Sequence, residues 1–558
     1  MKFSEIKYVR PDLEKLTADI KAFMGEFAKA KTYEQARKLY MENEKKAEDV
    51  IMMQTVAHIR STLDTRDEFY QNEMNYFYEE GPRVDLVSTE ANKLLLLSPF
   101  KTDFEKEFGA DFIKSIEAQQ KLNDESVISE KVEEGKLVQE YQQTTAMASV
   151  NFRGEECNFY GLLKHMLSTD RTERRDAFLA WAGLYESISE KLDAYFDRLV
   201  ALRKSMAKKL GFASYIDMAY LMNGHFYYGA KEVASFRQQV VDVVVPLAEK
   251  LYKEQQERLG VDTLRYFDEQ LCYREGNATP IGDKDYLVKC AHEMYNDMSK
   301  ETGEFFTHMV KNELFDLETK PGKQLGGYCT FIPVYNSPFI FSNFNGTSAD
   351  VDVLTHEAGH AFQSYVASKN VPLSSLIWST SEICEIHSMS MEHFAYPYMK
   401  KFFGEKADKY QYAHLSEAVK VMPYLCLVDH FQQEVYAHDY TAKERRTAWR
   451  RLEKIYMPWR DYDGNAFLEE GGFWMQKPHI FASPFYYVDY ALAQTAAFEY
   501  YARTKTDRKA VWEDYLNLCK AGGSKSYFEL LALGNLSNPF EKGTVEKVVK
   551  PIKEELLG

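Results

Sequence analysis

The stretch that most constrains this chain runs from residue 351 to 365 and reads VDVLTHEAGHAFQSY. Its apolar residues recur at three- and four-residue spacing, which predicts an amphipathic helix with one buried stripe. His356 and His360 fall roughly opposite that stripe, one helical turn apart, so both imidazoles can reach a single metal ion. Glu357 lies on the flank, where it can accept a proton from a water at the metal's open position. This HExxH pattern therefore predicts a helix that buries one face and presents a metal site on the other.

A third ligand is expected in the segment SEICEIHSMSMEHF, residues 381–394. A catalytic zinc ion usually takes three protein ligands and keeps its fourth position for water. The apolar residues of the segment gather on one helical side, and Glu385 and Glu392 share the opposite side. Glu385 is therefore the predicted ligand, and Glu392 is the candidate for orienting a histidine. We interpret Glu382 as a solvated charge at a helix start, and the two histidines of the segment as packed or hydrogen-bonded side chains.

HEAGH, followed by Glu385 in the context EIHSMSMEHF, resembles the M3 metallopeptidases. The bacterial oligoendopeptidase F and Pz-peptidase branch is the closer match. The resemblance implies that His356, His360 and Glu385 hold one Zn²⁺ per chain and that Glu357 is the general base. It also implies a mainly α fold, a helical two-lobed clamshell around a deep channel, with a small β-sheet beside the zinc-site helices. The expected activity is cleavage of internal peptide bonds in short unstructured oligopeptides.

A second informative passage near the C-terminus reads EEGGFWMQKPHIFASPFYYVDYALAQ. His479 follows a proline, and Tyr486, Tyr487 and Tyr490 are expected to open a helix, where three- and four-residue spacing lets one face present two phenols. The chain has 38 tyrosines, so the residues alone favour aromatic packing. The M3 resemblance implies instead that His479 and Tyr490 contact the substrate carbonyl and the tetrahedral intermediate. It leaves open whether Tyr486 or Tyr487 faces the substrate.

The passage from residue 321 to 347 is rich in glycine and strand-forming residues. Residues 339–344 read as a strand before a turn at Asn-Gly. A short sheet just before the HExxH helix can offer an edge strand to an extended peptide through main-chain hydrogen bonds. Gly326 and Gly327 are then candidates for close backbone approach to the substrate. A purely structural hairpin is the alternative.

The remaining sequence is mostly of helical periodicity. Residues 11–143 show apolar spacing of three and four almost throughout, with Pro11 suited to a first helical position. Alternation and a glycine between residues 146 and 160 suggest a short extended or hairpin element. Ser168, Thr169 and Asp170 are helix-start signals. We divide the chain into an N-terminal helical lobe, residues 1–145, and a catalytic region, residues 146–558.

Composition narrows the partners and the compartment. The net charge of −16 argues against a nucleic-acid partner or an anionic membrane surface. Seven cysteines without a paired framework fit reduced thiols in a cytoplasmic protein. The opening residues lack an apolar signal region, and no run of eighteen apolar residues occurs, so we expect a soluble chain that is not exported. The sequence indicates no oligomeric state.

Two other functions stay open at this point. A carboxypeptidase can carry the same metal motif, and a peptide-binding helical scaffold can hold a structural or vestigial metal. The presence of Glu357 argues against the scaffold, because structural zinc sites close with four protein ligands and need no adjacent base.

Overall fold

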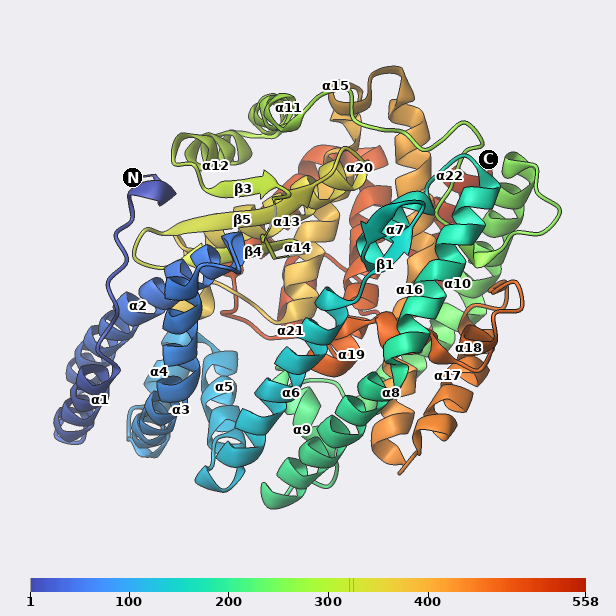
Figure 1. The fold of residues 1–558 in the computed structure, drawn as a ribbon. Helices are drawn as coiled ribbons and strands as arrows, with labels where there is room; N and C mark the ends of the chain where they lie inside the picture. The colour runs from blue at the N-terminus through green and yellow to red at the C-terminus, as the bar shows by residue number, and fades with distance from the viewer. Residues whose placement is uncertain (1, 321, 325) are drawn as a thin grey trace. The chain divides into compact units, whose positions relative to one another are not determined.

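The computed structural model describes residues 2–320, 322–324 and 326–558, and these are mainly helical with two small sheets (Figure 1). The mainly α fold predicted from the sequence is confirmed. Many helices begin directly after a polar side chain that accepts a hydrogen bond from the first turn, as Asp12, Thr32 and Asp170 do. Each such cap typically contributes about 1 kcal/mol.

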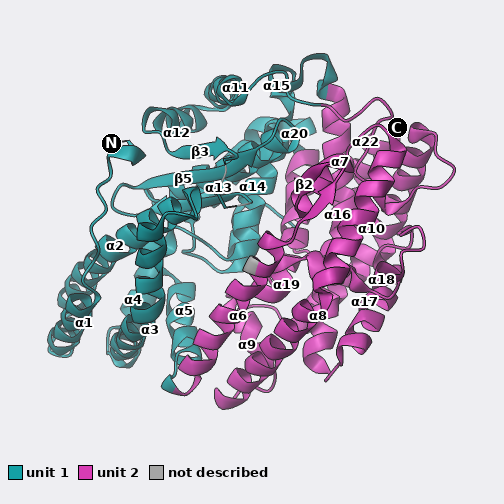
Figure 2. Cartoon of the chain, viewed as in Figure 1, with its two compact units in different colours: residues 1–125, 279–407, 503–537 teal, residues 126–278, 408–502, 538–558 magenta. Residues whose placement is uncertain are grey.

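The chain forms two compact units, and each is assembled from three separate segments (Figure 2). Unit 1 comprises residues 1–125, 279–407 and 503–537, and unit 2 comprises residues 126–278, 408–502 and 538–558. The predicted regions 1–145 and 146–558 describe contiguous stretches of sequence, and that division remains a prediction.

Unit 1 opens with a helical array. Its helices and strands are α1 (Leu13–Phe27), α2 (Tyr33–Leu63), α3 (Glu68–Leu97), α4 (Lys101–Phe108), α5 (Ala110–Leu122), α11 (Lys284–Met298), α12 (Lys300–Lys311), β3 (Phe315–Glu318), β4 (Tyr328–Ile332), β5 (Ser337–Phe344), α13 (Ala349–Ala367), α14 (Ser381–Phe394), α15 (Lys400–Phe403) and α21 (Tyr527–Leu533). The first helix begins at Leu13 and not at Pro11 as expected, because Asp12 is the cap that accepts from Lys15 N–H at 2.8 Å.

The predicted small sheet precedes the HExxH helix directly. Its order is β3-β5-β4, with β5 parallel to β3 and antiparallel to β4. The turn from β5 into α13 is held by Asp350, whose carboxylate accepts from Asn345 N–H at 2.9 Å and Gly346 N–H at 2.8 Å. Gly346 has φ 87°, a left-handed conformation that glycine adopts without strain. The sheet and this turn therefore set where α13 begins.

The apolar stripe predicted for α13 is confirmed. Val351, Leu354, Ala358 and Phe362 are at most 1% exposed. The Phe362 ring stacks with Tyr515 of α20 (Val488–Ala521) at 6.3 Å between centroids. One side of α13 thus lies in the core of unit 1, which leaves the opposite side for the site.

Unit 2 contains long helices and one two-stranded hairpin. Its remaining helices and strands are α6 (Ile128–Met147), β1 (Val150–Phe152), β2 (Glu155–Cys157), α7 (Phe159–His165), α8 (Arg171–Lys209), α9 (Tyr215–Met222), α10 (Ala230–Leu259), α16 (Ala407–Ala437, whose first residue falls in unit 1), α17 (Ala442–Tyr456), α18 (Ala466–Glu469), α19 (Pro478–Ala482) and α22 (Thr544–Leu557). The predicted extended or hairpin element is a hairpin, β1 and β2, and the predicted helix start is confirmed with Asp170 capping α8. The seven cysteines are free thiols, five of them buried. Among the described residues, no helix has the length and apolar content needed to cross a bilayer.

Candidate metal centre

Helices α13 and α14 bring the three predicted ligands together. One ligand atom from each of His356, His360 and Glu385 lies within 4.8 Å of the others. Glu385 Oε2 is 3.3 Å from His356 Nε2 and 3.4 Å from His360 Nε2. Ligands about 2.0–2.1 Å from a tetrahedral zinc ion stand roughly 3.3 Å apart. The donor types and their separations therefore fit zinc.

The charges of the three side chains are strongly coupled. Burial opposes ionisation of Glu385, but His360 and His356 outweigh it and hold the Glu385 pKa well below its ordinary value. Burial likewise opposes protonation of His356, and its hydrogen bonds to Glu385 and Glu392 overcome this and raise the His356 pKa well above its usual value. The cluster thus presents anionic oxygen to a cation at neutral pH.

Two further side chains orient the predicted ligands. The Glu392 carboxylate accepts a hydrogen bond from His356 Nδ1 at 2.6 Å, the contact expected from its place on α14. In the neutral form of the ring that binds a metal, this bond keeps the proton on Nδ1, so that Nε2 carries the lone pair. Ser388 Oγ donates to Glu385 Oε2 at 2.9 Å. The sequence reasoning did not include Ser388, although it lies one turn from Glu385 on the same helical side.

Gly359, inside HEAGH, determines how closely the two helices pack. A Cβ at this position would lie 2.6 Å from Ser388 Cα and 2.8 Å from the His387 carbonyl oxygen. Real Cβ atoms essentially never approach so closely, so only glycine lets α14 pack against α13 at this point. The sequence reasoning missed this role. A glycine in the middle of a helical pattern is the signal that could have revealed it, because its cost of about 1 kcal/mol requires a packing reason.

Glu357 lies beside the predicted ligands and is nearly buried, with 8% of its surface exposed. Burial raises its pKa, and His356 and His360 partly oppose that rise. A Cβ on Gly327 would lie 3.6 Å from Glu357 Oε1, so Gly327 contributes backbone next to the candidate base. Gly326 has φ 93° and is exposed, and a Cβ at its position would meet open space.

The second predicted group lies in unit 2. His479 is on α19, and its ring centroid is 6.0 Å from Tyr486, 4.8 Å from Tyr487 and 6.2 Å from Tyr490. Tyr487 is buried at 8% exposure under the Lys477 ammonium, which lies 4.6 Å from its ring centroid, whereas Tyr486 and Tyr490 are partly exposed.

One expectation about these tyrosines is wrong. The helix α20 begins at Val488, so Tyr486 and Tyr487 precede it and only Tyr490 is helical. The Ser-Pro-Phe turn before them explains the later start, because Phe485 adopts a positive φ of 67° that a helix does not allow.

The interpretation of Glu382 as a solvated charge is also wrong. Glu382 lies in the first turn of α14, as expected, but it is only 1% exposed. The two histidines of α14 are buried as predicted, and burial lowers the pKa of His387 to about 3, so its imidazole is neutral at pH 7.

Comparison with known proteins agrees with this fold. The peptidase M3 N-terminal domain family matches residues 3–123, and peptidase family M3 matches residues 164–286 and 291–549. A solved structure described as Pz peptidase A with an inhibitor superposes with a TM-score of 0.96 at 43% identity, covering 100% of this chain and 99% of that one.

Curated relatives are more distant. An oligoendopeptidase F homologue of Borreliella burgdorferi is 24% identical over 400 residues, 69% of this chain and 65% of that protein, so the chain spans just under two thirds of its length. The oligopeptidase PepF of Bacillus subtilis is 22% identical, covering 95% of this chain and 80% of that protein.

A mainly helical fold that carries HExxH and a following glutamate against a small sheet defines a metallopeptidase scaffold. The chain belongs to peptidase family M3. Its similarity to Pz peptidase and oligoendopeptidase F confirms the predicted branch.

Proposed function

We propose that the protein is a zinc-dependent endopeptidase that hydrolyses internal bonds of short unstructured oligopeptides. The observation that carries the proposal is the convergence of His356, His360 and Glu385, with their ligand atoms within 4.8 Å of one another and Glu357 alongside. Membership of family M3 and the names of the relatives support peptide hydrolysis. A cytoplasmic location belongs to the same proposal.

His356, His360 and Glu385 would hold one zinc ion. When bound, zinc supplies a Lewis acid that polarises the scissile carbonyl and acidifies water. Glu357 accepts the proton of the attacking water and passes it to the leaving amine, a role for which a buried carboxylate with a raised pKa is suited. Glu392 keeps His356 in the required tautomer throughout.

The aromatic group of unit 2 has a proposed part in the same reaction. Tyr490 donates its phenol hydrogen to the developing oxyanion, and His479 assists it. Tyr486 contacts the peptide in preference to Tyr487, which is buried beneath Lys477. The peptide itself pairs with β4, an outer strand of the sheet, past the backbone of Gly326 and Gly327.

The base is tested by Glu357→Gln. The variant should bind as much zinc as the wild type, while kcat on an internally quenched peptide falls by about 10²- to 10⁴-fold. Metal content by atomic emission and turnover on the same sample separate the two effects. Undiminished hydrolysis by the zinc-loaded variant would refute the assignment.

The oxyanion donor is tested by Tyr490→Phe, which should lower kcat by about 10²- to 10³-fold because one donor is lost. Tyr440→Phe is the matched control, since that phenol contacts Glu434 and has no proposed role in catalysis. An equal loss in both variants would contradict the proposal.

The substrate class is tested with a quenched peptide blocked at both ends. An endopeptidase cleaves it and a carboxypeptidase leaves it intact. Loss of cleavage on chelation and its return with zinc would also exclude a non-catalytic peptide-binding scaffold.

A further inference from the structure

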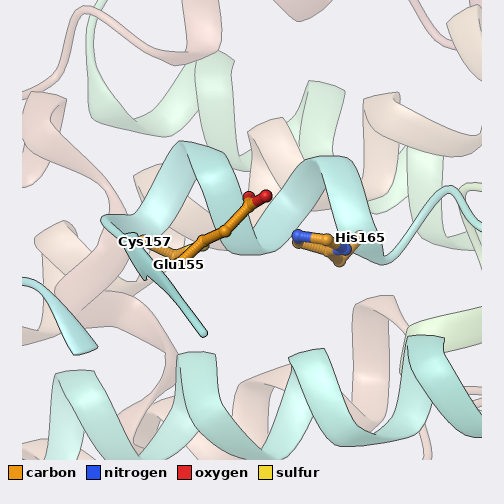
Figure 3. A group of neighbouring side chains, drawn as sticks. All are labelled: Glu155, Cys157 and His165. Carbon is orange, nitrogen blue, oxygen red and sulfur yellow. The ribbon is translucent and has the colours of Figure 1, made fainter. Parts of the chain in front are cut away.

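Outside the HExxH centre, the structure assembles a second set of metal-ligand types in unit 2. One ligand atom from each of Glu155, Cys157 and His165 lies within 4.8 Å of the others. Glu155 and Cys157 are two apart on β2, so their side chains leave the same face of the strand. His165 is the last residue of α7, which follows the hairpin directly. Figure 3 shows the Glu155 side chain extending toward the His165 ring.

The histidine is held in the orientation that metal ligands need. Its Nδ1 donates to Glu173 Oε1 at 2.6 Å, which leaves Nε2 with the free lone pair. The other oxygen of Glu173 accepts from Ser168 Oγ at 2.8 Å and lies 3.6 Å from Arg153, so Glu173 is committed to orienting the ring. The Phe152 ring packs on His165 at 4.9 Å between centroids. This carboxylate–histidine pair repeats the arrangement of Glu392 and His356.

The cysteine is equally well placed. Cys157 is buried and packs directly on the first turn of α7, where a Cβ at Gly161 would be 3.3 Å from Cys157 Cβ and 3.4 Å from Sγ. Asn158 caps α7 by accepting from Gly161 N–H at 2.9 Å, so hairpin and helix are joined rigidly. Glu155 is exposed, so a cation can enter from solvent.

We propose that Glu155, Cys157 and His165 form a second zinc site, with Glu173 orienting His165. Thiolate, imidazole and carboxylate are all zinc ligands, and a thiolate excludes magnesium and calcium as the preferred ions. Three protein ligands leave the fourth position for water. A zinc ion bound here links the β1–β2 hairpin to α7. The site is independent of the HExxH centre and raises the expected content from one zinc per chain to two. Glu155 and Cys157 also lie outside the three segments that the family models match, between residues 123 and 164.

Cobalt distinguishes the two sites, because only the second has a sulfur ligand. The metal-free full-length protein titrated with Co²⁺ should bind two ions per chain and develop a thiolate-to-cobalt charge-transfer band in the near ultraviolet. Cys157→Ser should lose the band and one equivalent of cobalt. The double variant His356→Ala/His360→Ala should keep the band and lose the other equivalent.

Further variants test the role of each carboxylate at the proposed site. Glu156→Gln, next to the site on β2 but bonded to Ser149, should leave the band unchanged, whereas Glu155→Gln should weaken cobalt binding. Glu173→Gln should weaken it by about 10- to 100-fold. If Cys157→Ser does not fold, His165→Gln serves in its place. A single bound cobalt without a thiolate band, or a band that survives in Cys157→Ser and His165→Gln, would overturn the proposal.

Discussion

Glu392 holds His356 by the ring nitrogen opposite the one that faces Glu385. A carboxylate in this position keeps the tautomer and raises the basicity of the ligand without touching the metal. The neighbouring Ser388 orients Glu385 by donating a 2.9 Å hydrogen bond to its carboxylate. Metal affinity in this protein should therefore depend on side chains behind the ligands as well as on the ligands themselves.

Replacing Glu392 tests this dependence. Glu392→Gln should weaken zinc binding at the HExxH centre by about 10- to 100-fold, because the amide orients His356 less strongly than the carboxylate. Competition with a zinc-binding dye measures the change. Glu304→Gln, an exposed carboxylate on α12, is the control and should bind zinc as the wild type does. Equal affinities for all three proteins would contradict the role of Glu392.

For single residues, the sequence correctly predicted on which side of a helix a side chain lies, because helical spacing alone determines it. Two histidines four apart and two glutamates seven apart lie on their expected sides of α13 and α14. The burial of Glu382 could not be predicted, because spacing along one helix does not tell which distant segments cover its first turn.

Helices α13 and α14 form the element pair on which the centre depends. They approach so closely at Gly359 that the backbone of α14 occupies the space that any larger side chain at this position would need. A displacement of α14 would move Glu385 away from both histidines, since the glutamate reaches them from the neighbouring helix.

Gly359→Ala should therefore destabilise the protein by about 1–3 kcal/mol through overpacking, and weaken zinc binding. Gly183→Ala is the matched control: Gly183 is exposed inside the long helix α8, and nothing outside its own helix lies within 4 Å of the added methyl. That substitution should stabilise by up to about 1 kcal/mol. Denaturant unfolding of both variants measures the difference, and the same sign for both would contradict the packing argument.

In unit 2, Arg237 of α10 and Asp429 of α16 form an ion pair that is almost fully buried. Asp429→Ala leaves the guanidinium without its partner and should cost about 3–5 kcal/mol in the free energy of unfolding. Glu304→Ala breaks the exposed contact with Lys300 and should cost less than about 1 kcal/mol. Urea unfolding compares them, and similar losses would show that burial is not the cause.

Elements defined by local signals were predicted well. The hairpin of β1 and β2 and the start of α8 follow from a glycine turn and a capping aspartate. The start of α20 was predicted wrongly. The positive φ of Phe485 before this helix depends on packing against Tyr436 and other rings distant in sequence, which local signals do not contain.

For the molecule as a whole, metal and folding are linked. A ligand that binds only the folded state stabilises it by mass action, about 2.7 kcal/mol at a free concentration one hundred times the Kd. Zinc should therefore raise the thermal midpoint of the metal-free protein, as calorimetry can measure. The variant His356→Ala/His360→Ala should show a smaller increase, and an unchanged increase would place the stabilising ion elsewhere.

The helical class and the family were predicted from sequence, whereas the composition of the two units was not. Helical periodicity is a local property, but the grouping of residues 1–125 with 279–407 and 503–537 arises from contacts between segments hundreds of residues apart.

This alternation of segments has a consequence for biosynthesis. The last segment of unit 1 is residues 503–537, and the last segment of unit 2 described here is residues 538–558. Neither unit can complete its core before its last segment has left the ribosome. The growing chain thus contains α13 and α14 before the last segment of their own unit, so the metal centre of unit 1 cannot reach its final packing until residues 503–537 have been synthesised.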